Sequence, residues 1–563
     1  MEENKIIEKK DYKYRNIIFA LLTIILLTIL SIAITPKELQ NDTFYTIKCG
    51  EYIFKNGIFN LTEDPFSWIE LPYTFPHWLY DLGIYGVFTN FGYEGIYVST
   101  IILATIMGLL VYKTCEMRSK NKVISLIIAL LAMYSMKPYI TARAQLVTFI
   151  LFLFELYSIE KLIDTSKKRY LIYLLLIPLL ITQLHCAVFP MFFILALPYI
   201  AEYILVWLSD LSIFDNVIKF IFKILKKIAK SEENKTKYEI KINKITQKIE
   251  KEKIEKQEKT KNPYKITRDR KKIIIYLLIT IIIAAGTGLI NPTGLGSYTY
   301  LVKTYQGNTT FSINEHLPLT LINNKEFSIV LITFVLILLF TDSKIRLSDF
   351  FMIAGLTYLS FKSARQISLF IIICSPILTK LIYDLIEKFD KDLILKIYKF
   401  STNFTGAIII ILLMTIYGER AYKEIGAQNF INETSYPVKA SQWIKENLDL
   451  ENLKLYNEYN YGSYLLLQDI PVFIDSRCDL YTPQFNANDE LDIFTDALSV
   501  PDMNENYEKI FNKYGVNYAI FYSNNKVCQL IDTDNNYAKV YQDDYFVIYE
   551  KLDAKEKSDI DEK

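Results

Sequence analysis

Two aspartates that could act in catalysis and a histidine–tryptophan pair stand within residues 41–82, directly after the first strongly apolar segment of the chain. They are Asp42, Asp64, His77 and Trp78, and many of the residues around them are aromatic. A carboxylate in a partly desolvated pocket can act as a general base, because desolvation raises its pKa toward neutrality. We therefore interpret this stretch as the chemical centre of the protein and the rest as a scaffold that holds it over a lipid-facing cavity.

The composition predicts that this scaffold lies in a membrane. Of the 563 residues, 51% are hydrophobic, and apolar runs of about twenty residues recur. Each run is long enough to cross the ~30 Å hydrocarbon core of a bilayer as a helix. The six cysteines are scattered and indicate neither a metal ribbon nor a disulfide framework, and nothing indicates a nucleic-acid partner. We expect an α-helical polytopic membrane protein with about eleven transmembrane helices and a C-terminal extracytoplasmic α/β domain.

Basic residues set the expected orientation and boundaries. Residues 1–16 carry four lysines and one arginine, so the positive-inside rule places the N-terminus in the cytoplasm. The expected organisation is a cytoplasmic N-terminus at 1–16, six transmembrane helices at 17–208 with a first outer loop at 36–94, a Lys-rich cytoplasmic insert at 209–272, five more transmembrane helices at 273–418, an extracytoplasmic domain at 419–551 and a charged tail at 552–563. The spans are expected at 17–35, 95–114, 123–136, 144–160, 170–184, 187–208, 273–290, 326–341, 350–361, 367–386 and 403–418, with an interfacial helix at 78–91.

Two regions differ from these apolar helices. Residues 219–272 hold 20 Lys and Arg against 8 Asp and Glu. Residues 218–230 have the pattern of a basic amphipathic helix suited to an anionic inner leaflet, and the remainder is a charged helix or a disordered insert, with partner docking as the alternative. The C-terminal domain is expected to contain a helix at 436–448 and strands at 453–457, 463–467, 471–475, 517–522 and 545–550.

This topology brings polar residues from distant parts of the sequence to one membrane face. All three histidines, His77, His185 and His316, fall there. The others are Asp42, Asp64, Arg143, Gln145, Asn291, Glu315 and Arg365. Charged groups are costly near lipid and usually face a cavity, so the convergence predicts a site. The alternative is that polar side chains collect at helix ends because water reaches them there.

Three patterns of the first outer loop resemble those of a known superfamily. They are D-T-F-Y-x-I-K-x-G-E-Y-I at 42–53, E-D-P-F-S-W at 63–68 and H-W-L-Y-D at 77–81. The loop resembles that of the GT-C glycosyltransferases, and more closely that of a group of bacterial multi-span proteins of this superfamily. Similar segments follow at 141–145, 184–185, 291–294, 313–316, 362–366, 456–459, 461–465 and 473–477. The resemblance covers nearly the whole chain except the Lys-rich insert.

The resemblance implies a transferase that takes a sugar from polyprenyl phosphate at the outer membrane surface. In such enzymes an acid of the first outer loop acts as the catalytic base or helps to hold a metal, and Asp42 matches that position. Asp64, the second catalytic candidate, could orient the acceptor or share a cation. Thr43 follows Asp42 where some branches have glutamate, and Arg143 lacks the proline that often stands beside it in the family.

This chemistry also needs groups that bind the departing phosphate and the substrates. The candidates for the donor phosphate are Arg143, Arg365, Lys362 and His185, and a guanidinium fork suits phosphate because it pairs with two oxygens. The candidates for substrate contacts are His77, Trp78, Gln145, Glu315 and His316. Asp42, His185 and Glu315 could together hold a divalent cation, Mg²⁺ or Mn²⁺, and no other cofactor is indicated.

Each candidate also has a simpler interpretation. Asp42 could cap a helix over 43–54, and Asp64 could belong to a turn before Pro65. The arginines could snorkel to the membrane interface, and a lone histidine at a helix end is more often a structural hydrogen-bonding group. His77 and its aromatic neighbours could serve as interfacial anchors.

The predicted function is a membrane glycosyltransferase that moves a sugar, by a single inverting displacement, from a polyprenyl-phosphate donor to a cell-envelope acceptor. Its partners would be the donor lipid, the bilayer and a glycan, lipid or protein acceptor. The alternative is a non-catalytic membrane protein, either a carrier or flippase for lipid-linked glycans or an envelope assembly factor. A flippase needs polar residues along its whole path, whereas the inner halves of the predicted spans are almost purely apolar.

Overall fold

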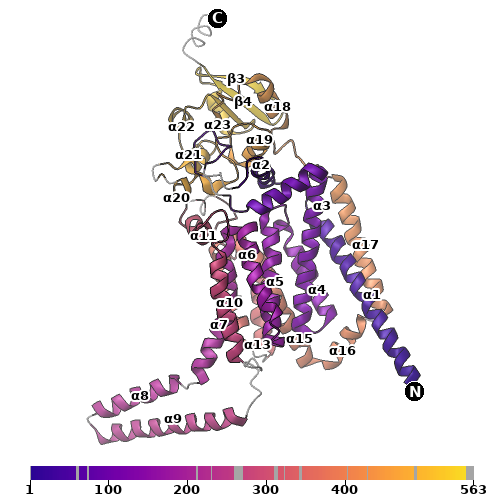
Figure 1. Ribbon diagram of the computed structural model, residues 1–563, viewed down its shortest axis with the longest axis vertical. Coiled ribbons are helices and arrows are strands. Elements are labelled where there is room, and N and C mark those ends of the chain that lie inside the picture. Colours follow the sequence, from indigo (N-terminus) through magenta and orange to yellow (C-terminus); the bar gives the residue numbers. More distant parts are fainter. Residues whose placement is uncertain are drawn as a thin grey trace, which may run out of the picture.

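A bundle of long helices carries a small mixed α/β domain at one end and a two-helix arm at the other (Figure 1). This computed structural model describes residues 2–58, 63–72, 75–210, 213–229, 231–258, 270–307, 309, 313, 315–322, 324–341, 345–401, 403–427, 429–486, 488 and 491–552. We call the end of the bundle that carries the C-terminal domain the domain end, and the other the opposite end.

Nearly the whole of each expected span is helical. The bundle contains α1 (Glu2–Ile34), α3 (Trp78–Ser119), α4 (Lys122–Ser135), α5 (Ala144–Thr165), α6 (Arg169–Leu184), α7 (Phe189–Asp210), α10 (Arg270–Thr287), α13 (Lys325–Thr341), α14 (Leu347–Lys362), α15 (Ile367–Phe389) and α17 (Phe404–Ala427). Shorter connecting helices are α2 (Asn41–Asn56), α11 (Gly296–Gln306) and α16 (Lys391–Phe400), and the arm consists of α8 (Ile213–Ile228) and α9 (Glu232–Glu258).

The lengths of these helices indicate a multi-pass membrane protein. Among the described residues, 5 helical segments are long and apolar enough to cross a membrane: Tyr14–Ile34, Trp78–Ser119, Cys186–Leu205, Ala364–Phe389 and Phe404–Gly426. Shorter apolar helices cover Lys122–Ser135, Arg169–Leu184, Ile275–Thr287 and Phe327–Phe340. The total of eleven spans and the direction in which they cross stay predictions.

A single glycine joins the expected interfacial helix to the second expected span. Both lie within α3, which breaks at Gly92, where φ is 63° and ψ is −156°. Glycine adopts this backbone conformation readily because it has no Cβ atom, whereas other residues do not. The chain can therefore turn at Gly92 from the part of α3 that crosses the domain end into the long part that runs through the bundle (Figure 1).

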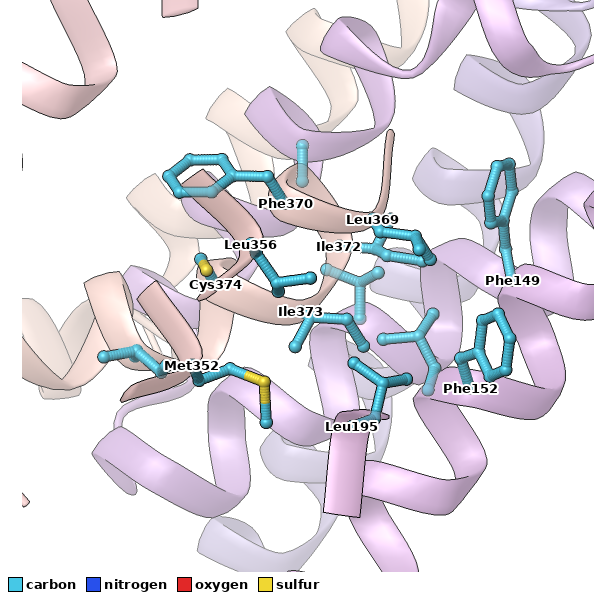
Figure 2. Close-up of a cluster of buried hydrophobic side chains, with 14 of the residues drawn as sticks. Phe149, Phe152, Leu195, Met352, Leu356, Leu369, Phe370, Ile372, Ile373 and Cys374 are labelled. Carbon is cyan, nitrogen blue, oxygen red and sulfur yellow. The ribbon is translucent and has the colours of Figure 1, made fainter. Parts of the chain in front are cut away.

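Apolar side chains fill the middle of the bundle. Phe149 and Phe152 of α5, Leu195 of α7 and the neighbouring Ile372 and Ile373 of α15 are buried in one cluster (Figure 2). Lipid tails are as apolar as these side chains, so helices in a membrane associate through close van der Waals packing more than through the hydrophobic effect. This packing holds the loops at the domain end in fixed relative positions.

A buried ion network holds the opposite end together. Arg118 of α3 donates to Glu160 of α5 at 2.9 Å, and Tyr199 of α7 donates to the same carboxylate at 2.9 Å. Arg346, which directly precedes α14, pairs with Asp349 at 2.9 Å and also contacts Glu160. Two arginines and two carboxylates balance one another, so the network joins four helices without leaving an unpaired buried charge.

The C-terminal domain is built on a mixed sheet. Its strands are β1 (Leu455–Tyr456), β2 (Tyr518–Tyr522), β3 (Tyr537–Gln542) and β4 (Phe546–Lys551), in the spatial order β1-β2-β4-β3. β1 is parallel to β2, and β4 lies antiparallel between β2 and β3. The helices are α18 (Val438–Asn447), α19 (Gly462–Leu467), α20 (Pro483–Asn486), α21 (Ile493–Ser499), α22 (Tyr507–Tyr514) and α23 (Lys526–Ile531).

Two of the strands expected from the sequence are wrong. Residues 463–467 form α19, and residues 471–475 make only one isolated bridge, between Val472 and Ser67. Short apolar runs do not distinguish a strand from a buried helix, because neither has a polar face to show its period. The expected helix at 436–448 and strands at 453–457, 517–522 and 545–550 correspond to α18, β1, β2 and β4. The pattern does not predict β3, most of whose residues are half-buried.

The segment between α1 and α3, which we call the first loop, is packed into the C-terminal domain. The indole Nε1 of Trp68 donates to the carbonyl of Leu455 at 3.1 Å. Cys49 and Ile53 of α2 are buried in the same apolar cluster as Phe473 of the domain. The first loop and the C-terminal domain therefore form one unit on the domain end of the bundle.

A buried ion pair reinforces this contact. The guanidinium of Arg477 donates to Asp64 of the first loop and, at 2.8 Å, to Asp475. The Tyr481 hydroxyl also donates to Asp475, at 2.7 Å. The three charged residues are all buried, so the loop cannot separate from the domain without leaving charges unpaired.

We expect Arg477→Met to lower the free energy of unfolding by about 3–5 kcal/mol, because Asp64 and Asp475 lose their buried cation. Thermal unfolding in detergent and limited proteolysis of the C-terminal domain would measure the change. Lys439→Met is a matched control, because Lys439 is exposed and lies 3.9 Å from Glu433. An exposed pair contributes at most about 1 kcal/mol, so equal losses in the two variants would contradict this account.

Candidate functional site

Three charged side chains from separate parts of the chain meet at the domain end. Asp42 lies in the first turn of α2, Arg143 directly precedes α5, and Glu315 lies between α11 and α13. Nε of Arg143 is 2.8 Å from Oδ2 of Asp42, an ion pair without the alignment of a hydrogen bond. Nη1 of Arg143 is 3.4 Å from both carboxylate oxygens of Glu315. We call this group the Asp42–Arg143–Glu315 cluster.

The local structure explains why Asp42 is available for this pairing. The N-cap of α2 is Gln40, so the interpretation of Asp42 as a helix cap is wrong. In the first turn its carboxylate is favoured by the helix dipole. Arg143 stands at the N-cap position of α5, and its guanidinium, which carries only donors, pairs with the two carboxylates.

Electrostatics keep Arg143 and Glu315 charged. Burial alone would lower the pKa of Arg143, but the carboxylates of Asp42 and Glu315 raise it above its ordinary value. Burial would raise the pKa of Glu315, but Arg143 and Arg365 lower it. The side chains of Arg143 and Asp42 are 23% and 22% exposed, so the cluster is only partly open to solvent.

A second arginine approaches from the connection between α14 and α15. Nη2 of Arg365 donates to Oε1 of Gln145 at 3.3 Å, and its backbone N–H donates to the carbonyl of Glu315 at 2.9 Å. The structure therefore brings the predicted residues Arg365, Gln145 and Glu315 together with Arg143. Burial and the charge of Arg365 lower the pKa of His316 to about 4, so His316 is neutral at physiological pH.

A hydrogen-bonded chain lies beside the cluster. Nδ1 of His77 is 2.5 Å from Oδ1 of Asp81, and Nε2 is 3.0 Å from the hydroxyl of Tyr45. Burial, with the charges of Asp42 and Asp81, raises the pKa of Tyr45 and keeps it protonated. Our sequence reasoning missed Tyr45 and Asp81. Their spacing could have shown them, because Tyr45 is three residues after Asp42 and Asp81 four after His77, which places each pair on one helix face.

His185 lies next to this chain. Its ring centroid is 6.2 Å from that of His77, and its Nδ1 is 2.9 Å from the hydroxyl of Thr148. Burial, together with the charges of His77 and Arg365, lowers its pKa well below the ordinary value. His185 is therefore neutral and hydrogen-bonded, as the structural interpretation expects, and its role at a phosphate stays a prediction.

Two further candidates contact residues outside the cluster. The ammonium of Lys362 lies over the ring of Tyr305, 5.1 Å from its centroid. The indole Nε1 of Trp78 donates to Gln183 at 3.2 Å. Both are on the domain end of the bundle, at the C-terminus of α14 and the N-terminus of α3.

Asp64 lies in the contact between the first loop and the domain. Besides Arg477, it accepts the backbone N–H of Ser67 at 2.8 Å, which agrees with the turn interpretation. Burial raises its pKa, although Arg477 opposes the effect. Its catalytic role stays a prediction.

The C-terminal domain contributes residues that our sequence reasoning also missed. Asn41 donates from Nδ2 to the carbonyl of Tyr459 at 2.9 Å, which places Tyr459 beside the start of α2. Asp479 accepts from the hydroxyl of Thr304 at 3.1 Å, and its other carboxylate oxygen is buried without a partner among the described residues. Burial raises the pKa of Asp479. No sequence pattern shows which loops of the domain face the bundle. The only signal in the sequence is that Tyr459 belongs to the segment 456–459 and Asp479 lies close to the segment 473–477, both of which resemble the GT-C group.

The predicted metal ligands do not form a set in this structure. The part of the chain that the structure describes contains no group of three His, Cys, Asp or Glu side chains placed to hold a metal ion. Arg143 lies between Asp42 and Glu315 and already pairs with both, and His185 is bonded to Thr148. This donor set does not fit a divalent cation, so we derive no chemical step through one.

Comparison of the sequence with protein-family models gives no match, and neither does comparison with curated proteins. The fold, however, is similar to that of the archaeal oligosaccharyltransferase AglB from Archaeoglobus fulgidus. In complex with an inhibitory peptide and a dolichol-phosphate, AglB has a TM-score of 0.50 and 13% sequence identity, covering 91% of this chain and 69% of that one.

Two further structures of the Archaeoglobus fulgidus oligosaccharyltransferase agree. The structure tethered to an acceptor peptide with the NVT sequon has a TM-score of 0.50, 12% identity and coverage of 89% and 69%. The apo form has a TM-score of 0.51, 13% identity and coverage of 91% and 69%. The fold of this chain is therefore AglB-like, and its assignment to the GT-C superfamily stays a prediction. At this identity the similarity concerns the fold alone.

The three histidines allow a direct test of the electrostatics, because ¹⁵N-histidine NMR would show only three imidazoles. We expect His316 to titrate at about pH 4. Arg365→Met should raise its pKa, because the substitution removes a nearby positive charge. Arg420→Met is the control, since Arg420 lies over the ring of Tyr134 instead. A His316 titration in the ordinary histidine range, or no response to Arg365→Met, would contradict the geometry described here.

Proposed function

We propose that the protein is a membrane glycosyltransferase that moves a sugar from a polyprenyl-phosphate donor to a hydroxyl of an acceptor. The observation that carries this proposal is the Asp42–Arg143–Glu315 cluster, which joins a carboxylate and a guanidinium at the domain end. The transfer needs these two groups, a base for the acceptor and a cation for the donor phosphate. The fold supports the proposal, because AglB is a glycosyltransferase whose structure contains a dolichol-phosphate.

In the proposed reaction Asp42 is the base. It takes the proton of the acceptor hydroxyl while the acceptor oxygen attacks the anomeric carbon of the sugar. The bond between that carbon and the phosphate oxygen breaks, its electron pair stays on the phosphate, and the configuration inverts. Arg143 and Arg365 pair with phosphate oxygens, whose negative charge increases as the bond breaks.

The pairing of Arg143 with Asp42 links donor binding to the strength of the base. A donor phosphate competes with the carboxylates for the same guanidinium, because its oxygens accept the same forked hydrogen bonds. When the phosphate takes the fork, Asp42 loses its cationic neighbour and gains a negative one, and both changes raise the proton affinity of a carboxylate. Arg143 thus couples the phosphate site to the base.

The remaining candidates are assigned to binding. His185 and Lys362 would contact the phosphate, for which Lys362 has to turn away from Tyr305. The substrate contacts would come from His77, Trp78, Gln145, Glu315 and His316, with Asp64 holding the first loop in place. Tyr459 and Asp479 of the C-terminal domain would meet the acceptor, a glycan, lipid or protein. A bound Mg²⁺ or Mn²⁺ would neutralise phosphate charge, but the donor set described above does not favour one.

We also infer that the domain end faces away from the cytoplasm, at the outer surface of the cell membrane. The basic N-terminal segment and the Lys-rich arm both lie at the opposite end (Figure 1). Lysine and arginine are enriched in cytoplasmic segments of membrane proteins, so the opposite end is the cytoplasmic one. The base and the phosphate site would then act on the outer leaflet.

The test compares the unsubstituted protein with Asp42→Asn in proteoliposomes that contain radiolabelled polyprenyl-phosphate sugars and envelope acceptors. We expect turnover by the unsubstituted protein and a loss of at least roughly 10²-fold in the variant, because the base is removed. Asp544→Asn is the matched control, since Asp544 is exposed on the C-terminal domain, and it should keep full activity.

Each other outcome has a definite meaning. Equal turnover by the Asp42→Asn variant and the unsubstituted protein, with both folded and inserted, would refute the assignment of Asp42 as the base. Binding of a donor without turnover by any variant would favour the alternative of a carrier of lipid-linked glycans. Transport of the donor between leaflets without sugar transfer would identify a flippase.

A further inference from the structure

The Lys-rich insert folds into an arm whose two helices pack side by side. The rings of Phe222 in α8 and Tyr238 in α9 are stacked with centroids 6.1 Å apart. Lys241 of α9 lies over the same phenylalanine at 5.0 Å, and Lys226 of α8 pairs with Glu239 of α9 at 2.8 Å. Residues 232–258 of the insert therefore form a charged helix, one of the two alternatives that the sequence left open, and α8 presents one defined face to it.

The face of α8 turned away from α9 is apolar and exposed. Its residues recur at helical spacing along the whole helix: Phe214, Val217, Ile218, Phe220, Ile221, Ile224, Leu225 and Ile228. Phe220 is 63% exposed and Ile228 is 69% exposed. Such a continuous apolar face on a soluble arm would be an interaction surface, because isolated apolar residues are common on protein surfaces but contiguous ones are not.

The position of the arm and its charges indicate what covers this face. The candidate span Cys186–Leu205 lies in α7, and α8 begins shortly after α7 ends at Asp210. Figure 1 shows α8 on the side of the arm nearer the bundle and α9 on the far side. Lys223 and Lys227, both exposed, border the apolar face of α8 on one side. An apolar face bordered by lysines at the level of a membrane surface is complementary to anionic lipid.

We propose that α8 lies in the surface of the bilayer at the opposite end of the bundle, with its apolar face among the lipid chains and its lysines at anionic headgroups. α9 then covers α8 on the side of the solvent, and its charged residues remain in water. The arm is thus a second membrane attachment, parallel to the surface, in addition to the helices that cross the bilayer. This inference does not depend on the proposed sugar transfer.

Spin labels on two isoleucines of the full-length protein test the proposal. Ile224→Cys carries the label on the apolar face of α8, and Ile240→Cys carries it on α9, where the isoleucine is 63% exposed. The native cysteines are buried or half-buried, and the unsubstituted protein measures their background. In proteoliposomes of equal parts phosphatidylcholine and phosphatidylglycerol, collisions with oxygen report lipid and collisions with a water-soluble nickel chelate report solvent.

We expect the α8 label to collide with oxygen and not with nickel, at a depth of about 5–10 Å below the headgroups. The α9 label should collide with nickel. Lys223→Glu combined with Lys227→Glu should move the α8 label into water in these vesicles, because anionic lipid then repels the helix. The matched change Lys237→Glu, at an exposed position of α9, should have no such effect.

Three results would overturn the proposal. Nickel collisions at both labels would show that the arm stands free in solvent. Protection of the α8 label from both oxygen and nickel would show that protein, such as a second copy of the chain, covers the face. Equal embedding of the α8 label in vesicles of pure phosphatidylcholine would show that anionic headgroups play no part.

Discussion

The ion pair between Arg477 and Asp64 determines where the candidate site can lie. Arg477 belongs to the C-terminal domain, whereas Asp64 belongs to the first loop, which also carries α2 and therefore Asp42. Separating a buried pair leaves uncompensated charges, which costs far more than separating an exposed one. The domain is thus fixed to the loop, and the loop to the bundle. The Asp42–Arg143–Glu315 cluster lies where the first loop meets the bundle, because Asp42 belongs to the loop and Arg143 and Glu315 belong to connections between the helices of the bundle.

Charge balance then governs what the site can do. Arg143 and Arg365 face the carboxylates of Asp42 and Glu315, so the four side chains together carry no net charge. An incoming phosphate makes the group negative, and a carboxylate in a negative, partly buried environment binds a proton more tightly. In the function proposed above, a phosphate that binds Arg143 would therefore make the carboxylate of Asp42 a stronger base. The proposed base and the proposed phosphate site would share Arg143, so their coupling would need no larger movement.

Sequence periodicity and length were sufficient for the bundle but not for the domain. Apolar runs long enough to span a bilayer can hardly be anything but helices, because lipid leaves no partner for backbone groups except those within the helix. The run at 463–467 lacks this constraint. It is short and, apart from Ser463, largely apolar, and contacts with the rest of the domain decide that it becomes α19. The bend in α3 is a detail of the bundle that the sequence does not predict. The sequence predicts only two neighbouring helices there, whereas the positive φ of Gly92 creates the bend between them.

The candidate site also has one part that the sequence predicts and another part that it does not. Residue type and the expected membrane face are enough to name Asp42, Arg143, Gln145, Glu315 and Arg365 as candidates, because charged groups near lipid usually face a cavity. The sequence does not predict how these residues pair. Asp42 and Arg143 are far apart in sequence, and their contact exists only when α2 and the start of α5 are packed together. Asp64 has the same residue type as Asp42 and lies in the same loop. What separates the two is a partner more than 400 residues away, Arg477, and no local pattern contains that information.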